Sequence, residues 1–246
     1  MKTKLKILKL FLGIAVFIFL VSFSAKRHAC KPVADVLIEI DHSSENRFVN
    51  DELVRNLLDG KDLRVSSTPL GNLNIRKIEK SLNQNPFVKK SEVFKDVDGN
   101  LSVKINQKTP IMRVNTGVEE YYLSDELTKI PLSNLYSAQV LLAGGPIKKS
   151  DFSGLKALSE AISADKLLKK HIIAVKKVEP NSFNLFVNKG NYIIEFGELR
   201  DFDEKFEKLI LFYDQYLDKV GLNYYSKINL KYKNQIVATK RKNDEN

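Results

Sequence analysis

The stretch Val88–Pro110 reads VKKSEVFKDVDGNLSVKINQKTP. Near its middle, Asp98-Gly99 is a dipeptide typical of tight hairpin turns, so the stretch predicts two antiparallel strands. After the turn, apolar and polar residues alternate from Leu101 to Gln107, which predicts one buried and one solvated face. The run ends at Lys108-Thr109-Pro110, and because proline interrupts regular structure, we expect a domain boundary there.

A strand and two helices are expected before this hairpin. Val36–Ile40 is a mostly apolar run that predicts a strand. A first helix is expected from the capping Asn50 through Leu58, followed by Gly60 where a helix end favours a left-handed residue. Asn74 can cap a second helix, which ends before Asn85-Pro86. Together with the hairpin, residues 33–109 are therefore expected to form a β-α-α-β-β unit.

Strands dominate the second domain, which we expect over residues 110–240, with a short solvated tail at 241–246. Turns are expected at Gly144-Gly145-Pro146 and Lys189-Gly190-Asn191. The domain is predicted to be mixed α/β with a mainly antiparallel sheet, and the chain as a whole to be α+β. The expected strands are Tyr121–Leu123, Val140–Leu142, Ile172–Val178, Phe183–Val187, Tyr192–Phe196 and, in a closing hairpin that turns at Lys233-Asn234, Ile228–Tyr232 and Ile236–Thr239.

Two helices are expected within this domain. One is lined by Leu155, Leu158 and Ile162 at helical spacing. The other begins after the expected cap Asp201 and ends before Gly221. Its apolar residues predict a buried stripe of Phe202, Phe206, Leu209, Tyr213, Leu217 and Val220.

The chain begins with an apolar segment, Leu5–Phe23, that has no acidic residue and follows a lysine-rich start. The uninterrupted run Leu10–Val21 has the length of a signal-peptide core, and small residues precede Ala25 as in a cleavage site. As a helix the whole segment is roughly 28 Å long, enough for a ~30 Å hydrocarbon core. The residues leave both interpretations open. In either, the N-terminus stays in the cytoplasm and the rest is exported.

The net charge of +10 is concentrated at this start, since residues 1–31 carry seven Lys or Arg and no acid. The rest of the chain has a surplus of only three positive charges. A basic pI would otherwise favour nucleic-acid binding, which we therefore do not expect. Cys30 is the only cysteine, so the chain can form no internal disulfide.

Catalytic signatures are missing from the sequence. Its three histidines have no metal-ligand spacing, and no nucleophile, P-loop or dinucleotide motif is present. The pair Glu119-Glu120 could serve a glycosidase, but nothing places a second carboxylate opposite it. We expect no catalytic, cofactor or metal site and no small-molecule substrate. The remaining interpretation is a protein that binds other proteins.

Four short motifs follow one another along the chain. They are a basic-x-Pro-apolar join at Lys108–Ile111, the segments Tyr121–Asp125 and Ile130–Ser133, and the closing run Ile228–Asn234. In this order and spacing they resemble the FtsQ/DivIB cell-division family, and the β-α-α-β-β unit is similar to its POTRA domain. The run Tyr232–Val237 resembles a Bacteroidetes variant of the family. Departures from the usual pattern are Asn229, Gln235 and Glu126-Leu127.

For the N-terminal segment, the resemblance implies a retained single-span anchor rather than a cleaved signal. Residues 1–9 would be cytoplasmic and residues 10–24 transmembrane, in a type II protein of the inner membrane enriched at the division septum. The POTRA domain at 33–109 and the FtsQ-type β domain at 110–240 would lie in the periplasm. The anchor residues in contact with membrane lipid would be Leu10, Phe11, Leu12, Ile14, Val16, Phe17, Ile18, Phe19, Leu20 and Val21.

For function, the resemblance implies a non-enzymatic divisome scaffold that helps recruit and regulate septal peptidoglycan synthesis. Its partners would be the bitopic proteins FtsB and FtsL, bound by strand addition at the C-terminal strand. The POTRA unit would dock other divisome membrane proteins. Alternatives are a POTRA-bearing protein of envelope or outer-membrane biogenesis and a secreted cell-wall enzyme. The partner-binding positions that match the family are Lys231, Tyr232, Asn234, Ile236 and Val237.

Overall fold

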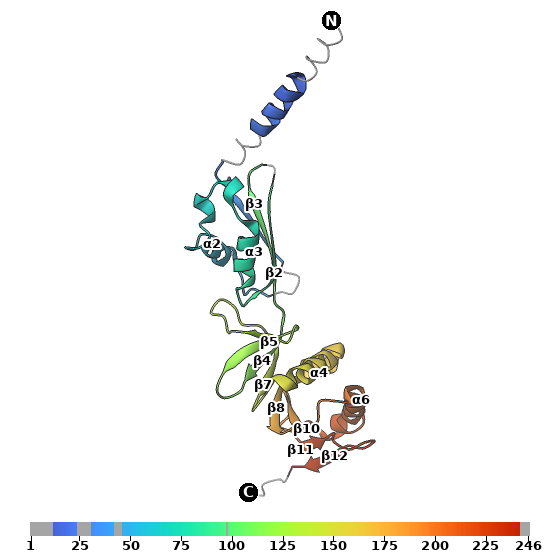
Figure 1. Ribbon diagram of the computed structural model, residues 1–246. Coiled ribbons are helices and arrows are strands. Elements are labelled where there is room, and N and C mark those ends of the chain that lie inside the picture. The colour runs from blue at the N-terminus through green and yellow to red at the C-terminus, as the bar shows by residue number, and fades with distance from the viewer. Residues whose placement is uncertain (1–11, 24–30, 42–45, 97, 242–246) are drawn as a thin grey trace. The chain divides into compact units, whose positions relative to one another are not determined.

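The computed structural model describes residues 12–23, 31–41, 46–96 and 98–241 (Figure 1). The chain divides into two compact units, one ending at Gln107 and the other beginning at Lys108. This division lies next to the boundary expected at Lys108-Thr109-Pro110. Each unit has a buried hydrophobic core of its own.

Residues 12–23 form a helix whose apolar side chains are exposed. Within the described parts of the chain, no helix combines the length and the apolar character that a membrane span needs. The span expected over residues 10–24 starts and ends outside the described residues, because Leu10, Phe11 and Ser24 are not among them.

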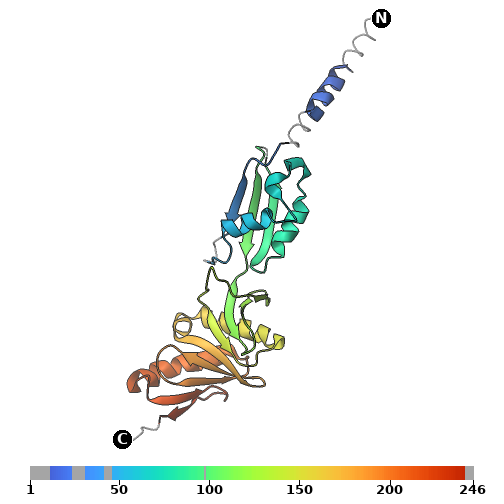
Figure 2. The same cartoon turned by 90° about the vertical axis from the view of Figure 1, so that its left-hand side faces the viewer.

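The first unit is a three-stranded sheet with two helices packed on one face (Figures 1 and 2). The central strand β3 pairs in parallel with β1 and antiparallel with β2. The predicted β-α-α-β-β order is confirmed. Its elements are β1 (Val36–Ile40), α2 (Asp51–Leu58), α3 (Ile75–Asn83), β2 (Val88–Lys95) and β3 (Leu101–Gln107), with 3-10 turns at Val65–Ser67 and Leu70–Asn72.

Local signals explain these elements. The Asn50 side chain accepts a hydrogen bond from the Leu53 N–H at 2.9 Å and thereby caps α2. In the same way, the Asn74 side chain accepts from the Lys77 N–H at 3.0 Å and caps α3. The alternation predicted for β3 is also confirmed, since its inward side chains are fully buried: Leu101, Val103 and Ile105.

The end of α2 differs from the prediction at Gly60. The helix ends at Asp59 with an ordinary negative φ of −95°, and the left-handed backbone comes later, at Arg64, with φ 47°. The N–H groups of Leu63 and Arg64 both bond to the Gly60 carbonyl, at 3.1 and 3.2 Å. A further turn of backbone therefore follows the helix, and Gly60 does not reverse the chain.

The second unit contains one mixed sheet (Figure 2). Its described strands follow the order β12-β11-β10-β9-β8-β7-β4-β5-β6. The pairs β4–β7, β7–β8 and β10–β11 are parallel and the other five are antiparallel, which confirms a mainly antiparallel sheet. The strands are β4 (Pro110–Asn115), β5 (Glu120–Ser124), β6 (Lys129–Ile130), β7 (Leu141–Gly144), β8 (Ile172–Glu179), β9 (Ser182–Val187), β10 (Ile193–Gly197), β11 (Tyr225–Asn229) and β12 (Val237–Lys240).

Helices cover one face of this sheet and bury its apolar residues (Figure 1). Phe202 and Phe206 pack on Phe196 of β10, with ring centroids 5.8 and 5.4 Å apart. The residues predicted to line the first helix are buried, namely Leu155, Leu158 and Ile162. The helices are α4 (Phe152–Ala164), α5 (Lys166–His171), α6 (Phe202–Phe212) and α7 (Asp218–Val220).

A π-helical turn, Tyr213–Leu217, separates α6 from α7. A π turn has more residues than an α turn, so it rotates the residues that follow it around the helix axis. Tyr213 and Leu217 remain buried, as predicted, whereas Val220 is 43% exposed. The predicted place of Val220 in the buried stripe is therefore wrong. Gly221 ends the helix with the left-handed φ of 84° that its position suggests.

The start of α6 and the strand β4 also differ from the prediction. Asp201 has a left-handed backbone with φ 56°, and its side chain caps no N–H. Pro110, expected to mark only a boundary, is the first residue of β4. Proline is tolerated there because the first residue of a strand can lack an N–H.

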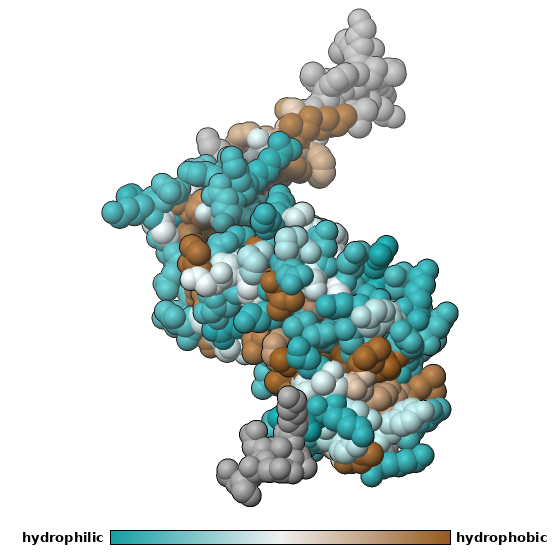
Figure 3. Space-filling view, turned by 90° about the horizontal axis from the view of Figure 1, so that it is seen from below, coloured by the Kyte–Doolittle hydropathy of each residue, from teal (hydrophilic) through white to brown (hydrophobic). Residues whose placement is uncertain are grey.

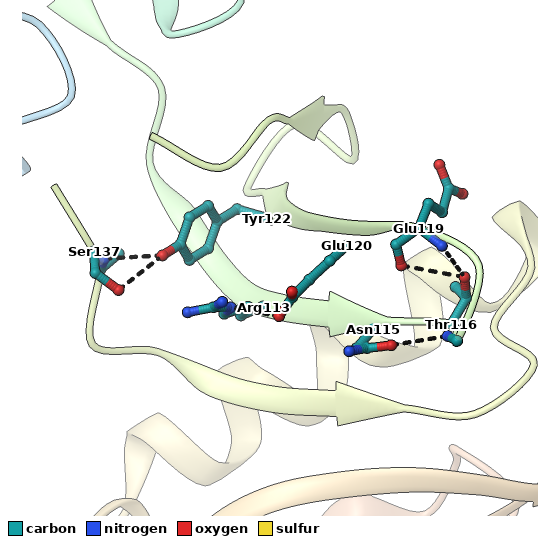
Figure 4. Close-up of polar contacts among 9 residues, drawn as sticks. Arg113, Asn115, Thr116, Glu119, Glu120, Tyr122 and Ser137 are labelled. Atoms are coloured by element: carbon teal, nitrogen blue, oxygen red, sulfur yellow. Dashed lines mark hydrogen bonds and ion pairs between the residues drawn. The ribbon is translucent and has the colours of Figure 1, made fainter. Parts of the chain in front are cut away.

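Tyr122 of β5 ties a loop to the sheet (Figure 4). Its hydroxyl lies 3.2 Å from Ser137 Oγ and accepts a hydrogen bond from the Ala138 N–H at 3.2 Å. Beside it, Arg113 of β4 forms an ion pair with Glu120 at 2.8 Å. Glu119 likewise pairs with Lys129 of β6, so both acids considered for catalysis have structural contacts with strands of the sheet.

A buried ion pair joins β8 to the start of α4. Lys177 Nζ lies 2.7 Å from Asp151 Oδ2, and the two side chains are only 7% and 9% exposed. The same oxygen accepts the Lys148 N–H at 2.7 Å. A buried charge that loses its partner is costly, so this pair constrains how the helix layer meets the sheet.

Replacing Lys177 by methionine would leave the Asp151 carboxylate buried without its counter-charge. We expect the free energy of unfolding to fall by about 3–5 kcal/mol. The double variant K177M/D151N removes the buried charge but keeps an acceptor for Lys148, so it should recover much of this loss. Urea unfolding followed by circular dichroism measures both, and a double variant as unstable as K177M would contradict the pairing.

Candidate partner-binding edge

Strand β12 lies at one end of the sheet of the second unit. It pairs antiparallel with β11, and no described strand pairs with its outer side. An edge strand has backbone groups that a strand from another chain can use. Val237, one of the expected binding positions, is the first residue of β12 and is 44% exposed.

The closing hairpin is displaced from its predicted place. Its strands are Tyr225–Asn229 and Val237–Lys240, joined by a loop at 230–236. Lys231, Tyr232 and Asn234 therefore lie in this loop and not on a strand, so the predicted strand Ile228–Tyr232 is wrong in extent.

The reason for this shift is the parallel pairing of β11 with β10, which ends at Glu195 opposite Asn229. Next in the chain, Leu230 is fully buried and its N–H bonds to the Glu195 carbonyl at 2.9 Å. The Asn229 side chain donates to the Glu195 carboxylate at 2.8 Å, and Lys227 lies 3.3 Å from it. Burial of Leu230 thus turns the chain out of the sheet two residues before Tyr232.

Helix α6 holds the loop in place. Lys208 Nζ donates to the Tyr232 carbonyl at 2.9 Å and to the Glu204 carboxylate at 3.1 Å. The hydrogen bond from Lys208 lowers the pKa of Glu204, and the backbone N–H of Asn234 lowers it further. Asn234 has the positive φ, 57°, predicted for this turn. The half-exposed Tyr232 side chain is therefore presented from an anchored backbone.

The Lys231 side chain lies against Gly197 of β10. A Cβ atom at Gly197 would lie 3.0 Å from Lys231 Cγ, and Gly197 has a φ of +79°. Only glycine fits this position without strain. Lys231 and Lys233 also line a hollow of about 450 Å³, together with further charged residues of both signs: Arg200, Lys205, Glu179, Glu198 and Asp201. Lys205 is nearly buried, and desolvation lowers its pKa.

The far end of β12 is fixed by Arg241. Its N–H bonds to the Tyr224 carbonyl at 2.9 Å, and its guanidinium donates to the backbone carbonyls of Asn223 and Asn191. Lys240 Nζ lies 5.3 Å from the centroid of the Tyr224 ring, and its hydrogen bond with that tyrosine raises its pKa. Arg241 is therefore part of the folded unit and not of a solvated tail.

The backbone of β12 alternates in direction. The Arg241 N–H and the Thr239 carbonyl both bond toward β11, the latter through Ser226 Oγ at 3.2 Å. Successive N–H groups of a strand point to opposite sides. The N–H groups of Ala238 and Lys240 therefore point outward, where the carbonyl oxygens of a partner strand could accept hydrogen bonds from them.

The residues around the edge are strongly basic. From Lys219 to Arg241 the chain carries six Lys or Arg residues and no acid. Lys227 is partly neutralised by Glu195 of β10. The edge thus suits an acidic partner. Lys208, Glu204 and Arg241 were missed by the sequence argument, although Glu204 and Lys208 have the i,i+4 spacing of a helical ion pair.

In the parts of the chain that the structure describes, no cluster of three or more His, Cys, Asp or Glu residues could hold a metal ion.

The Ile236 side chain packs against the core, unlike the exposed Tyr232 and Val237. The edge therefore combines exposed side chains, outward backbone groups and positive charge. These are properties of a surface that binds another protein.

An open and basic sheet edge of this kind is a surface that a strand from another protein can use. A family described as "FtsQ/DivIB, C-terminal related" matches residues 109–239, and a "POTRA-like domain" family matches residues 29–106. The chain belongs to the FtsQ/DivIB family, which confirms the resemblance in the sequence. This is a family of non-enzymatic scaffolds of cell division. A comparison with curated proteins found no match.

Replacing Lys208 by methionine would remove the charged hydrogen bond to the Tyr232 carbonyl while keeping the aliphatic stem. We expect the loop 230–236 to open more often, by about 1 kcal/mol or roughly fivefold. Hydrogen exchange followed by mass spectrometry measures this, with α3 in the other unit as the internal reference. Unchanged exchange in the loop would show that α6 does not hold it.

Proposed function

We propose that this chain is a bitopic scaffold of the division machinery that binds an FtsB/FtsL-type partner by strand addition at β12. Through this contact it helps recruit and regulate septal peptidoglycan synthesis. The observation that carries the proposal is the open edge of β12, with outward N–H groups at Ala238 and Lys240. Membership of the FtsQ/DivIB family supports the scaffold role.

The contact would combine three kinds of interaction. Backbone hydrogen bonds along β12 would provide the affinity common to strand addition. Tyr232 would supply a flat, half-exposed anchor, and Lys231 would pair with an acid of the partner. The anchored loop would lower the entropic cost of binding, because its backbone is already held by Lys208.

The membrane part of the proposal rests on the N-terminal segment. We infer that residues 10–24 form a retained single span that places both compact units in the periplasm. The apolar character of Leu5–Phe23 and the basic residues on both sides of it support this orientation. The POTRA-like unit would then be a second docking module, for other membrane proteins of the divisome.

Proline at position 238 tests strand addition. It would remove an outward N–H without removing a bond to β11, so we expect folding to be kept and recovery of a co-expressed FtsB/FtsL-type partner to fall about tenfold or more. The matched control is A238V, which keeps the N–H and should retain the partner. Circular dichroism checks the fold of both variants. Full partner recovery with folded A238P would exclude β12 as the binding strand.

Alkaline extraction of membranes, combined with the mass of the N-terminal peptide, tests the anchor. We expect the full chain in the membrane pellet with its lysine-rich start intact, because an apolar span of this length resists extraction. A chain that begins at Ala25 in the soluble fraction would show a cleaved signal and would contradict the scaffold.

A further inference from the structure

A row of aromatic rings runs from the end of α6 to the end of the edge strand. Phe212 stacks on Tyr216 with ring centroids 5.6 Å apart, and it contacts Tyr225 at 5.4 Å. Tyr225 meets Tyr224 edge-on at 5.0 Å. Lys240 of β12 lies over the Tyr224 ring. We call the exposed members, Tyr216 and Tyr224 with Lys240, the aromatic shelf.

The shelf tyrosines are exposed, whereas the aromatic rings they contact are more buried. Tyr216 is 54% exposed and stacks on Phe212, which is 9% exposed, and Tyr224 is 37% exposed and contacts the partly buried Tyr225. The π turn contains Tyr216 and also turns Val220 outward, so it interrupts the buried stripe next to the edge. Such single π turns inside helices are frequent at functional sites. Figure 3 shows apolar side chains at the surface among polar ones.

The shelf lies on the helix-covered side of β12. Tyr225 of β11 is the register partner of Lys240, and both Tyr225 and Ala238 pack against the core on this side. A strand added at the outward N–H groups of Ala238 and Lys240 would send every second side chain to this same side.

We propose that the aromatic shelf is a second contact for the partner strand, and that it takes one large apolar side chain of an acidic, extended segment. The inference rests on the proposed strand addition and specifies the partner segment. In that segment, every second residue, on the shelf side, would be apolar, and its acidic residues would lie near the cations of the edge. From Lys219 to Arg241, which includes β11 and β12, the chain carries six cations and no acid, and this favours an acidic segment along β12, whereas Asp214 and Asp218 flank Tyr216 in the sequence. Exposed tyrosines are favoured anchors for such a contact.

A photo-crosslinking amino acid at position 216 of the full chain, in growing cells, tests the occupant. The same amino acid at Val237 reports strand addition itself, and at Val118 it serves as the control. Val118 is 96% exposed in the turn between β4 and β5, at the other end of the sheet order. We expect crosslinks from 216 and 237 to the same peptide of one partner, with Asp or Glu within about four residues, and none to it from 118.

Other crosslinking results separate the two proposals. Crosslinks from 237 to a partner, with none from 216, would overturn the shelf and leave strand addition intact. Crosslinks from 216 to a second copy of this chain, or to a protein other than the one reached from 237, would also overturn it. The absence of any partner at 237 would overturn both.

Substitution gives an independent measure. We expect Y216S to weaken recovery of the partner identified by crosslinking about tenfold, and Y216F, which keeps the ring, to stay within about twofold of the parent. V118S is the matched loss of an exposed apolar side chain and should have no effect. Normal binding by folded Y216S, beside a loss in A238P, would show that the partner adds to β12 without using the shelf.

Discussion

The arrangement of the second unit depends on the need of backbone N–H and C=O groups for hydrogen-bond partners. Each inner strand of its sheet has two neighbours, whereas among the described residues β12 and β6, at the two ends of the strand order, have one each. This leaves the outward groups of Ala238 and Lys240 to water or to another chain. The rest of the edge is arranged around this strand. Arg241 fixes the far end of β12, and Leu230 fixes the end of its neighbour β11 on Glu195 of β10, so the open side is presented by an anchored ladder.

Helix α6 and the π turn after it link the core to the edge. Phe206 and Leu209 are buried in the core, while Lys208, one turn away from Glu204, reaches the Tyr232 carbonyl. The same helix continues into the turn that exposes Tyr216. Packing in the core thus sets the position of the loop 230–236 and of the aromatic shelf together. The two positions are linked because one element, α6 with its π turn, carries Lys208, which contacts the loop, and Tyr216, which belongs to the shelf.

Much of the fold could be predicted from local signals. The caps Asn50 and Asn74, the alternation in β3 and the Asp98-Gly99 turn act over a few residues, and each predicted its element. The errors fall where distant contacts decide. Leu230 is buried by the parallel pairing of β11 with β10, which no local pattern reveals, so the closing hairpin was placed three residues late at its start. Uninterrupted α-helical spacing predicts Val220 on the buried face, and the π turn that moves it outward has no clear sequence signal.

The sequence by itself determined the β-α-α-β-β unit, the family, the basic character of the C-terminal region and the absence of recognisable catalytic motifs. These depend on residue types and short spacings. Only the tertiary structure decided that Lys231, Tyr232 and Asn234 lie in a clamped loop, that β12 is an edge strand, and that Tyr216 is exposed on the π turn after α6. The physical reason is that an edge exists only once all other strands have been paired. The order of strands in a sheet depends on contacts between segments far apart in the chain.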